Sequence, residues 1–329
     1  MTKVDKMTKK FRLSIPIVYL ELLLMIIIWS FSFVIVDIAL EFIPPLSIAL
    51  YRFIIASAAF LIMDLYTKVR KKKNRTEINK INNSEASKFS RNDWILMLFA
   101  SFTGVSIFFF AQYTAIQIIG PSLPALFVCL LAPIVITVLA LIFFNEKLTR
   151  LKIIGFIIAT IGGFFLITGG NVKNFTPRTP NFLGYLFALI TPFLWGAYSI
   201  ITKKITQKKS SIKMLRNIAY FGTIELFIFV LISKELLVFI QNFLNILLFL
   251  CALYIGIGCY ILGYYIWQKS QTKLRSSKAA SFLYIEPFIT LVFSFLLQRS
   301  ETILLWNILG GIIVLIAVLI INYEKFQFA

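Results

Sequence analysis

Four ionisable side chains, Glu21, Arg52, Glu225 and Glu286, lie inside long apolar stretches of this sequence. A charged side chain at the centre of a bilayer costs at least about 2.5–3.5 kcal/mol, which makes such a residue a candidate for a functional site. Glu21 lies close to the end of its stretch, where its side chain can extend to the membrane surface. Glu225 and Glu286 lie near the middle of theirs, so we expect each of them to have a partner or a function.

The charges of these four residues do not balance, because three are acidic and one is basic. The forked donors of Arg52 suit either a substrate carboxylate or an ion pair with one glutamate. A buried carboxylate without a cation tends to take up a proton. At least one glutamate is therefore expected to be protonated or to be neutralised by a substrate amino group. Glu286 and Glu225 are the candidates for proton coupling.

Pro287 directly follows Glu286, and its missing N–H frees a main-chain carbonyl about one turn earlier and permits a kink. Aromatic and polar side chains of neighbouring stretches would complete a pocket beside this break, because aromatic faces hold cations and apolar groups. The predicted substrate-binding residues are Trp29, Arg52, Gln112, Trp195, Tyr198, Glu225, Tyr254, Tyr260, Tyr284 and Glu286, with Tyr220 as a further aromatic candidate. Tyr113 and Trp267 are instead expected in aromatic belts at the membrane surfaces.

Several kinds of chemistry are excluded by residue type. The sequence contains no histidine, which removes histidine-based triads, imidazole proton relays and histidine zinc sites. The three cysteines, Cys129, Cys251 and Cys259, all fall in apolar stretches and indicate packing rather than disulfides or a metal site. No phosphate-binding loop of the ATPase kind occurs. We expect no catalytic residue, no metal and no cofactor.

The elements that carry these residues are predicted to be transmembrane helices. The chain has 329 residues, of which 59% are hydrophobic, and a mean hydropathy of +0.88; soluble domains have about 45–50% apolar residues. The apolar stretches are long enough to span a bilayer as helices and lack the alternation of barrel strands. The ten predicted helices are 17–40, 45–66, 94–113, 122–144, 151–168, 182–202, 214–233, 246–267, 277–298 and 303–323.

The distribution of basic residues predicts the orientation. With the N-terminus in the cytoplasm, 28 of the 33 Lys and Arg residues fall on the cytoplasmic side, which agrees with the positive-inside rule. This placement explains the net charge of +19 without a nucleic acid partner. Residues 1–16 and 324–329 are therefore predicted to be cytoplasmic termini, and residues 67–93 a flexible basic cytoplasmic loop in a protein of the cell membrane.

An internal repeat relates the two halves of the chain. The corresponding residues are Pro133 and Pro287, Glu146 and Glu301, Gly155 and Gly310 and, more weakly, Trp29 and Trp195. Five helices per half would invert the second copy in the membrane, an architecture common in transporters, with the site near the midplane. The predicted units are a first repeat 17–168, an extracytoplasmic linker 169–181 and a second repeat 182–323. Each matched glutamate is expected to stabilise the start of the following helix.

On these residues the chain resembles the drug/metabolite transporter superfamily, specifically its ten-helix EamA-type branch. The resemblance is carried by Trp29, Arg52 with Phe53, Pro133, the run from Glu146 to Thr149, Gly155, Glu286 with Pro287, Glu301, and Gly310 with Gly311. Two departures suggest that the halves differ in function: the second half has no counterpart of Arg52, and Lys-Leu-Thr does not follow Glu301. The resemblance implies transport of small metabolites, often the export of amino acids.

The predicted function is secondary active transport, as export, of a small organic metabolite such as an amino acid by alternating access, with proton coupling as an option. A drug or organic-cation exporter is the alternative. A membrane-embedded lipid-modifying enzyme is less favoured, because no histidine or paired loop carboxylates could form its catalytic cluster. The expected partners are the substrate and the lipid bilayer, and the sequence leaves a monomer and a homodimer open.

Overall fold

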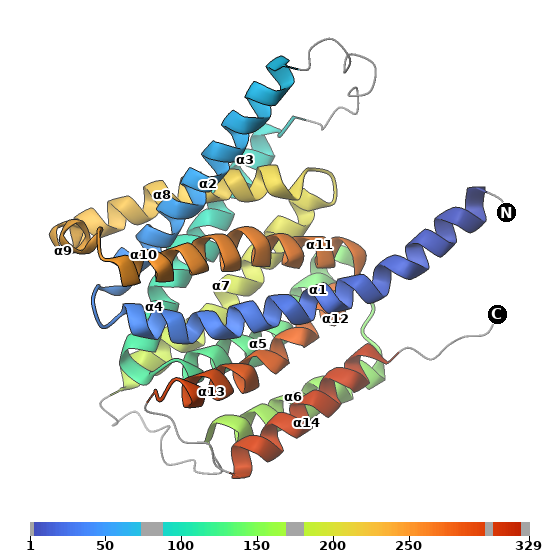
Figure 1. Ribbon diagram of the computed structural model, residues 1–329. Coiled ribbons are helices and arrows are strands. Elements are labelled where there is room, and N and C mark those ends of the chain that lie inside the picture. Colours follow the sequence, from blue (N-terminus) through green and yellow to red (C-terminus); the bar gives the residue numbers. More distant parts are fainter. Residues whose placement is uncertain (1–2, 74–87, 169–180, 300–304, 324–329) are drawn as a thin grey trace.

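The computed structural model describes residues 3–73, 88–168, 181–299 and 305–323, and these residues form helices joined by short connections (Figure 1). The first half contains α1 (Lys3–Ala39), α2 (Pro45–Lys73), α3 (Arg91–Ser101), η1 (Phe102–Ser106), α4 (Ile107–Ile119), α5 (Ser122–Phe144) and α6 (Arg150–Thr168). The second half contains α7 (Phe182–Thr206), α8 (Ser211–Ile232), α9 (Leu236–Asn242), α10 (Ile246–Leu253), η3 (Tyr254–Tyr264), α11 (Tyr265–Lys273), α12 (Ser276–Ser281), η4 (Phe282–Ile285), α13 (Glu286–Leu296) and α14 (Leu305–Asn322).

Eight helical segments of the described residues are long and apolar enough to cross a membrane. They are Ile17–Ala39, Pro45–Val69, Arg91–Ile119, Ser122–Phe144, Phe182–Thr206, Ser211–Ile232, Ile246–Lys273 and Ser276–Leu296. Eight of the ten predicted helices coincide with these segments. Of the other two, 151–168 falls in α6 and the described part of 303–323 consists mainly of α14; these two helices pack along each other on one side of the bundle (Figure 1). The total of ten membrane crossings stays a prediction.

Three of the membrane segments depart from regular α-helix. The third contains the π-helix η1, the seventh contains the longer π-helix η3, and the eighth contains the 3-10 segment η4. The segment η4 ends directly before Glu286 and Pro287, where the sequence predicts a break, because Pro287 has no N–H for the preceding turn. π-Helical turns are rare and often lie at functional sites.

The helix limits correct three of the expectations from the sequence. Helix α1 begins at Lys3 instead of 17, and α2 continues to Lys73, so part of the predicted flexible loop 67–93 is helical. Residues 74–87 lie outside the described part of the chain. The short helix α9 was not predicted, because its seven residues cannot span a membrane. Its start approaches α2 through Ser47, whose hydroxyl donates to Glu235 over 3.0 Å.

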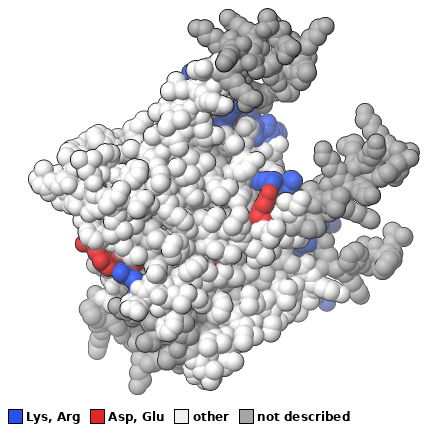
Figure 2. All heavy atoms as spheres, in the orientation of Figure 1, with Lys and Arg blue, Asp and Glu red and all other residues white. Residues whose placement is uncertain are grey.

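Charged side chains gather at the two ends of the bundle. Figure 2 shows a wide uncharged surface between charged groups at opposite margins. Large apolar side chains such as Leu20, Ile62 and Ile232 are exposed on the outside of the bundle, as expected of helices that face lipid. The core between the helices is apolar and closely packed, so the buried polar residues described next are exceptions to it.

Candidate functional site: a charged aromatic cavity

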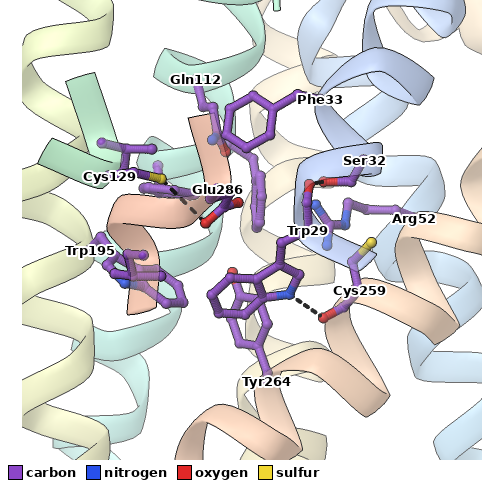
Figure 3. Close-up of a pocket in the computed structure, with 14 residues that line it drawn as sticks. Trp29, Ser32, Phe33, Arg52, Gln112, Cys129, Trp195, Cys259, Tyr264 and Glu286 are labelled. Carbon is purple, nitrogen blue, oxygen red and sulfur yellow. Dashed lines mark hydrogen bonds between the residues drawn. The ribbon is translucent and has the colours of Figure 1, made fainter. Parts of the chain in front are cut away.

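A cavity of about 50 Å³ lies inside the bundle, where α1, α2, α4, α5, α7, η3, η4 and α13 meet (Figure 3). Its aromatic lining consists of Trp29, Phe33, Phe108, Phe109, Trp195 and Tyr264. Its other polar and sulfur-containing lining residues are Ser32, Arg52, Gln112, Cys129, Cys259 and Glu286. Ligand pockets usually measure about 300–1,000 Å³, so this cavity is contracted in the conformation described.

Arg52 forms one wall of the cavity and is only 3% exposed. Its Nη1 donates to the hydroxyl of Tyr113 over 2.5 Å, and its Nη2 donates to the main-chain oxygen of Ile255 over 2.9 Å. The guanidinium lies 4.0 Å from the centre of the Phe109 ring, a cation–π arrangement. Its Nε is buried without a hydrogen-bond partner. In the described part of the chain Arg52 therefore has an unused donor and no carboxylate partner.

Glu286 lies across the cavity from Arg52 and is also 3% exposed (Figure 3). Its Oε2 accepts a hydrogen bond from the Cys129 thiol over 3.2 Å, and among the described residues no cation pairs with it. The main-chain oxygen of Glu286 accepts from the hydroxyls of Ser30 and Thr290, over 3.1 and 3.0 Å. These two bonds fix the backbone beside Pro287 and hold the carboxyl against the cavity.

The aromatic residues form a connected group around these two charges. The rings of Trp29 and Trp195 meet edge to face, with centres 5.3 Å apart, and Tyr264 lies within 5.6 Å of both. The indole of Trp29 donates to the main-chain oxygen of Cys259 over 3.1 Å. Gly263 makes this approach possible, because an added Cβ there would lie 2.3 Å from Trp29 Nε1. The wall combines flat apolar faces with few polar groups, as ligand sites commonly do.

The structure brings five of the ten predicted substrate-binding residues to this cavity. These are Trp29, Arg52, Gln112, Trp195 and Glu286. Tyr198 lies behind the wall, with its ring stacked on Trp195 at 5.1 Å. The other four predicted residues, like Tyr220, do not line it.

Those four residues have other partners. The hydroxyls of Tyr254 and Tyr260 donate to the main-chain oxygens of Ile28 and Leu215, each over 2.8 Å, and so join helices. Tyr284 packs with Phe156 in a separate core cluster between α6, α13 and α14. The carboxyl group of Glu225 lies within hydrogen-bond distance of two serines, one on α3 and one on η1.

Two aromatic residues expected in surface belts are instead buried. Tyr113 is 2% exposed and holds Arg52, and Trp267 is fully buried within 6.1 Å of Trp29. The expectation was wrong because the position of a residue along a predicted helix gives only its depth in the membrane. Whether the side chain contacts lipid depends on the side of the helix on which it lies. Sequence reasoning also left Tyr264 out of the site and assigned Cys129 and Cys259 to packing, although all three line the cavity. Tyr264 follows the predicted Tyr260 by one helical turn, a spacing that places both on one face.

Ion pairs hold both ends of the bundle. At one end, Lys203 Nζ lies 2.6 Å from Glu146 Oε1 and 2.6 Å from Ser276 Oγ. Both carboxylate oxygens of Glu146 also accept from the Ser276 main-chain N–H, each over 3.0 Å. Glu146 therefore joins α7 and the start of α12 in the other half, and was wrongly expected to stabilise the helix that follows it. Its counterpart Glu301 lies outside the described residues.

Glu146 shows how this cluster tunes a carboxyl group. Burial alone would raise the pKa of Glu146, but the hydrogen bonds from Lys203 and Ser276 outweigh it and hold that pKa below its usual value. Lys152 Nζ donates to Ser277 Oγ over 2.9 Å beside this group.

Three further ion pairs connect helix ends. Glu21 on α1 pairs with Lys269 on α11 at 2.5 Å, so its side chain has a partner near the end of the span. Arg299, after α13, contacts Asp37 and Glu41 at 2.6 Å each. Ion pairs therefore join neighbouring helices at both ends of the bundle.

Comparison with known proteins shows which family this sequence belongs to. The model of the EamA-like transporter family matches residues 16–168 and again residues 182–323. Two uncharacterized transporters of Archaeoglobus fulgidus are 22% and 25% identical, over 94% and 93% of this chain and 98% and 99% of their own lengths. An uncharacterized transporter of Bacillus subtilis is 23% identical over 92% of each chain. One solved structure, 15% identical with a TM-score of 0.64, covers 93% of this chain and 96% of its own and shares the fold.

Proposed function

Because the chain belongs to the EamA-like transporter family and is a multi-pass membrane protein, we propose that it exports a small zwitterionic metabolite, such as an amino acid, by alternating access. The observation that carries this proposal is the pair of opposite charges, Arg52 and Glu286, which line one cavity without an ionic partner among the described residues. Leaving two such charges buried is costly. A ligand that carries both complementary charges would offset that cost.

The chemistry of each wall assigns the parts of the ligand. The substrate carboxylate would accept from Arg52, whose Nε is free to donate, and its ammonium group would donate to Glu286. The faces of Trp29 and Trp195 would hold the remaining apolar part. Since the cavity measures about 50 Å³, the walls must separate to admit such a ligand, as alternating access requires.

The proposed architecture has ten membrane crossings in two inverted five-helix repeats, and the helix packing supports it. Under this scheme α6 corresponds to α14 and α2 to α8, and each of these pairs packs together. The packing of α5 on α7 has its counterpart in α13 on α1, and that of α4 on α7 in η3 on α1. The π-helices η1 and η3 would occupy equivalent segments. The two separate matches to one family model agree with this arrangement.

Binding to the purified protein in nanodiscs tests the substrate class. Amino acids should stabilise the protein against heat, whereas amines without a carboxylate and carboxylates without an amine should have much weaker effects. Arg52→Gln and Glu286→Gln should each abolish the stabilisation by amino acids. Tyr254→Phe is the matched control, because it removes a polar group outside the cavity. Equal stabilisation by amino acids in wild type and both cavity variants would contradict the proposal.

An organic-cation exporter is the second candidate, favoured by the aromatic residues around Glu286. The same binding experiment separates the two candidates. If amines without a carboxylate stabilise the protein as strongly as amino acids, and Arg52→Gln retains that effect, the substrate is a cation.

The proposed orientation places both termini in the cytoplasm of a cell-membrane protein. Reporters after Ala329 and between Lys173 and Arg178 should lie on opposite sides of the membrane, the first inside. Finding both on the same side would contradict the ten crossings.

A further inference from the structure

Glu225 lies on α8 in the middle of a membrane segment, half-buried and outside the cavity. Its Oε1 lies 2.6 Å from the hydroxyl of Ser101, and its Oε2 lies 2.5 Å from the hydroxyl of Ser106. Ser101 directly precedes the π-helix η1, and Ser106 is its last residue. One carboxyl group therefore bridges the two ends of a π-helix.

The hydrogens at this group can be counted. A serine hydroxyl has one hydrogen to donate, yet Ser101 Oγ lies within hydrogen-bond distance of both Glu225 Oε1 and the main-chain oxygen of Leu98, the latter at 2.9 Å. Serines in helices commonly donate to such a preceding carbonyl. If Ser101 donates to Leu98, the hydrogen between Ser101 and Glu225 must come from the carboxyl. Ser106 then donates to Oε2, and every hydrogen is used once.

No other charge accounts for Glu225. The charged and titratable groups on the elements packed against α8 include Arg52 and Asp64 on α2, Asp93 on α3, Tyr198 on α7 and Lys269 on α11, with Arg216 and Tyr220 on α8 itself. In the described part of the chain none of them forms an ion pair or a hydrogen bond with Glu225. Arg216 instead pairs with Asp64 at 2.7 Å, and Lys269 with Glu21. A lone ionised carboxylate at this depth is costly, and a bound proton removes that cost.

The π-helix η1 connects this group to the cavity wall. Gly104 in η1 packs directly on the ring of Tyr198, since an added Cβ there would lie 2.1 Å from Tyr198 Cδ2. Tyr198 stacks on Trp195, which lines the cavity. A change in the bonds at either end of η1 would therefore act on the wall through two contacts.

We propose that Glu225, Ser101 and Ser106 form a proton-binding site separate from the cavity, and that its loading is linked to the cavity wall through η1. Loading adds one proton to Glu225 Oε1, which then donates to Ser101 Oγ. Release leaves a carboxylate, and the hydrogen of Ser101 turns from Leu98 to Oε1. The role of this proton in transport rests on the proposed function; the site itself does not. Glu286 is then left to bind substrate.

Infrared spectroscopy of the protein in lipid, without any substrate, tests the site. Wild type near neutral pH should show the C=O stretch of protonated carboxyl groups, and Glu225→Gln should remove the component that belongs to Glu225. Ser101→Ala should shift this band to higher frequency, because the Glu225 carboxyl loses its hydrogen-bond acceptor. The Ser101→Ala variant also tests the site if Glu225→Gln fails to fold. Glu286→Gln is the matched control, because it removes the other buried carboxyl without a cation and should leave the Glu225 component in place. Absence of the band in wild type, or its persistence unchanged in Glu225→Gln, would overturn the proposal.

Tryptophan fluorescence tests the link to the wall, again without substrate. Emission of wild type should change with pH, and the change should be lost in Trp195→Phe and in Glu225→Gln. A pH-dependent change that persists in Glu225→Gln would refute the link. Because neither experiment uses a ligand, failure of the substrate assignment would leave their outcomes unaffected.

Discussion

Two groups of buried charge in this protein are arranged in opposite ways. Arg52 and Glu286 line the cavity without ionic partners among the described residues, whereas Lys203 and Glu146, at the end of the bundle, lie 2.6 Å apart. The side chains of the second pair are also largely buried, at 7% and 13% exposure. Burial alone therefore does not decide whether a charge is paired. The comparison indicates that an ion pair stabilises the end of the bundle, whereas the charged groups of the cavity remain free to bind a ligand.

The largest expected effect on stability is at the paired group. Lys203→Met leaves Glu146 buried without its cation and should lower the free energy of unfolding by about 3–5 kcal/mol. The double variant Glu146→Gln with Lys203→Met should recover most of this loss, because no charge remains uncompensated. Chemical denaturation in detergent measures both. A double variant as unstable as the single one would show that the pair acts through packing.

The cavity should respond in substrate binding instead of stability. Arg52→Gln removes charged hydrogen bonds to the proposed substrate carboxylate, each worth about 1.5–3 kcal/mol, so binding should weaken roughly 10- to 100-fold. The loss of stability should be smaller than for Lys203→Met, since no opposite charge is left without a partner. Isothermal titration calorimetry measures the binding. Arg52→Lys keeps the positive charge but loses the forked pair of donors. Its affinity for the substrate should therefore lie between those of wild type and Arg52→Gln.

Lowering the pH should weaken the ion pair between Lys203 and Glu146. The pKa of Glu146 is held below its usual value, since Lys203 and Ser276 outweigh the effect of burial. The pair therefore contributes its full stability above the ordinary glutamate pKa, and that contribution is lost as pH falls through the lowered pKa. The thermal midpoint of wild type should fall over this acidic range, and that of Glu146→Gln should fall less. Parallel curves for the two proteins would contradict this assignment.

The smallest effect is expected at the opposite end of the bundle. Arg299 pairs with Asp37 and with Glu41, whose side chain is 52% exposed. Exposed pairs contribute about 0.2–1 kcal/mol, and the side chain of Asp37 is only 16% exposed, so Arg299→Gln should lower the free energy of unfolding by about 1–2 kcal/mol, less than Lys203→Met. Raising the salt concentration should narrow the difference from wild type. A loss as large as that of Lys203→Met would mean that both ends are held equally.

The sequence predicts eight membrane segments that the structure supports, because each is a local property of about 20 consecutive residues. It also identifies Trp29, Arg52, Gln112, Trp195 and Glu286, since polar or large aromatic side chains in apolar helices are conspicuous. It favours Glu286 through the break at Pro287 but assigns Glu225 to the site as well, because only the packing of helices decides which of the two faces the cavity. Tyr113 was misplaced for the same reason.

Other features depend on contacts between distant segments. The π-helices η1 and η3 have no residue pattern comparable to the proline in the first turn of α13, so their positions could not be predicted. The partner of Glu146 is a lysine far along the chain on α7. From the sequence alone, Glu146 was expected to stabilise the start of the helix that follows it, because no local pattern points to a lysine on α7.

The pairing of α6 with α14 has a consequence for how such proteins diverge. Among the described residues, none from these two helices lines the cavity, and the pair closes on itself where Gly162 meets Ile313. Mutations that change the preferred substrate are therefore expected on the helices that line the cavity, whereas α6 and α14 are constrained by their fit to each other and to α5, η4 and α12. Gene duplicates can exchange their cargo while inheriting this pair unchanged, so its sequence would record ancestry better than it records selectivity.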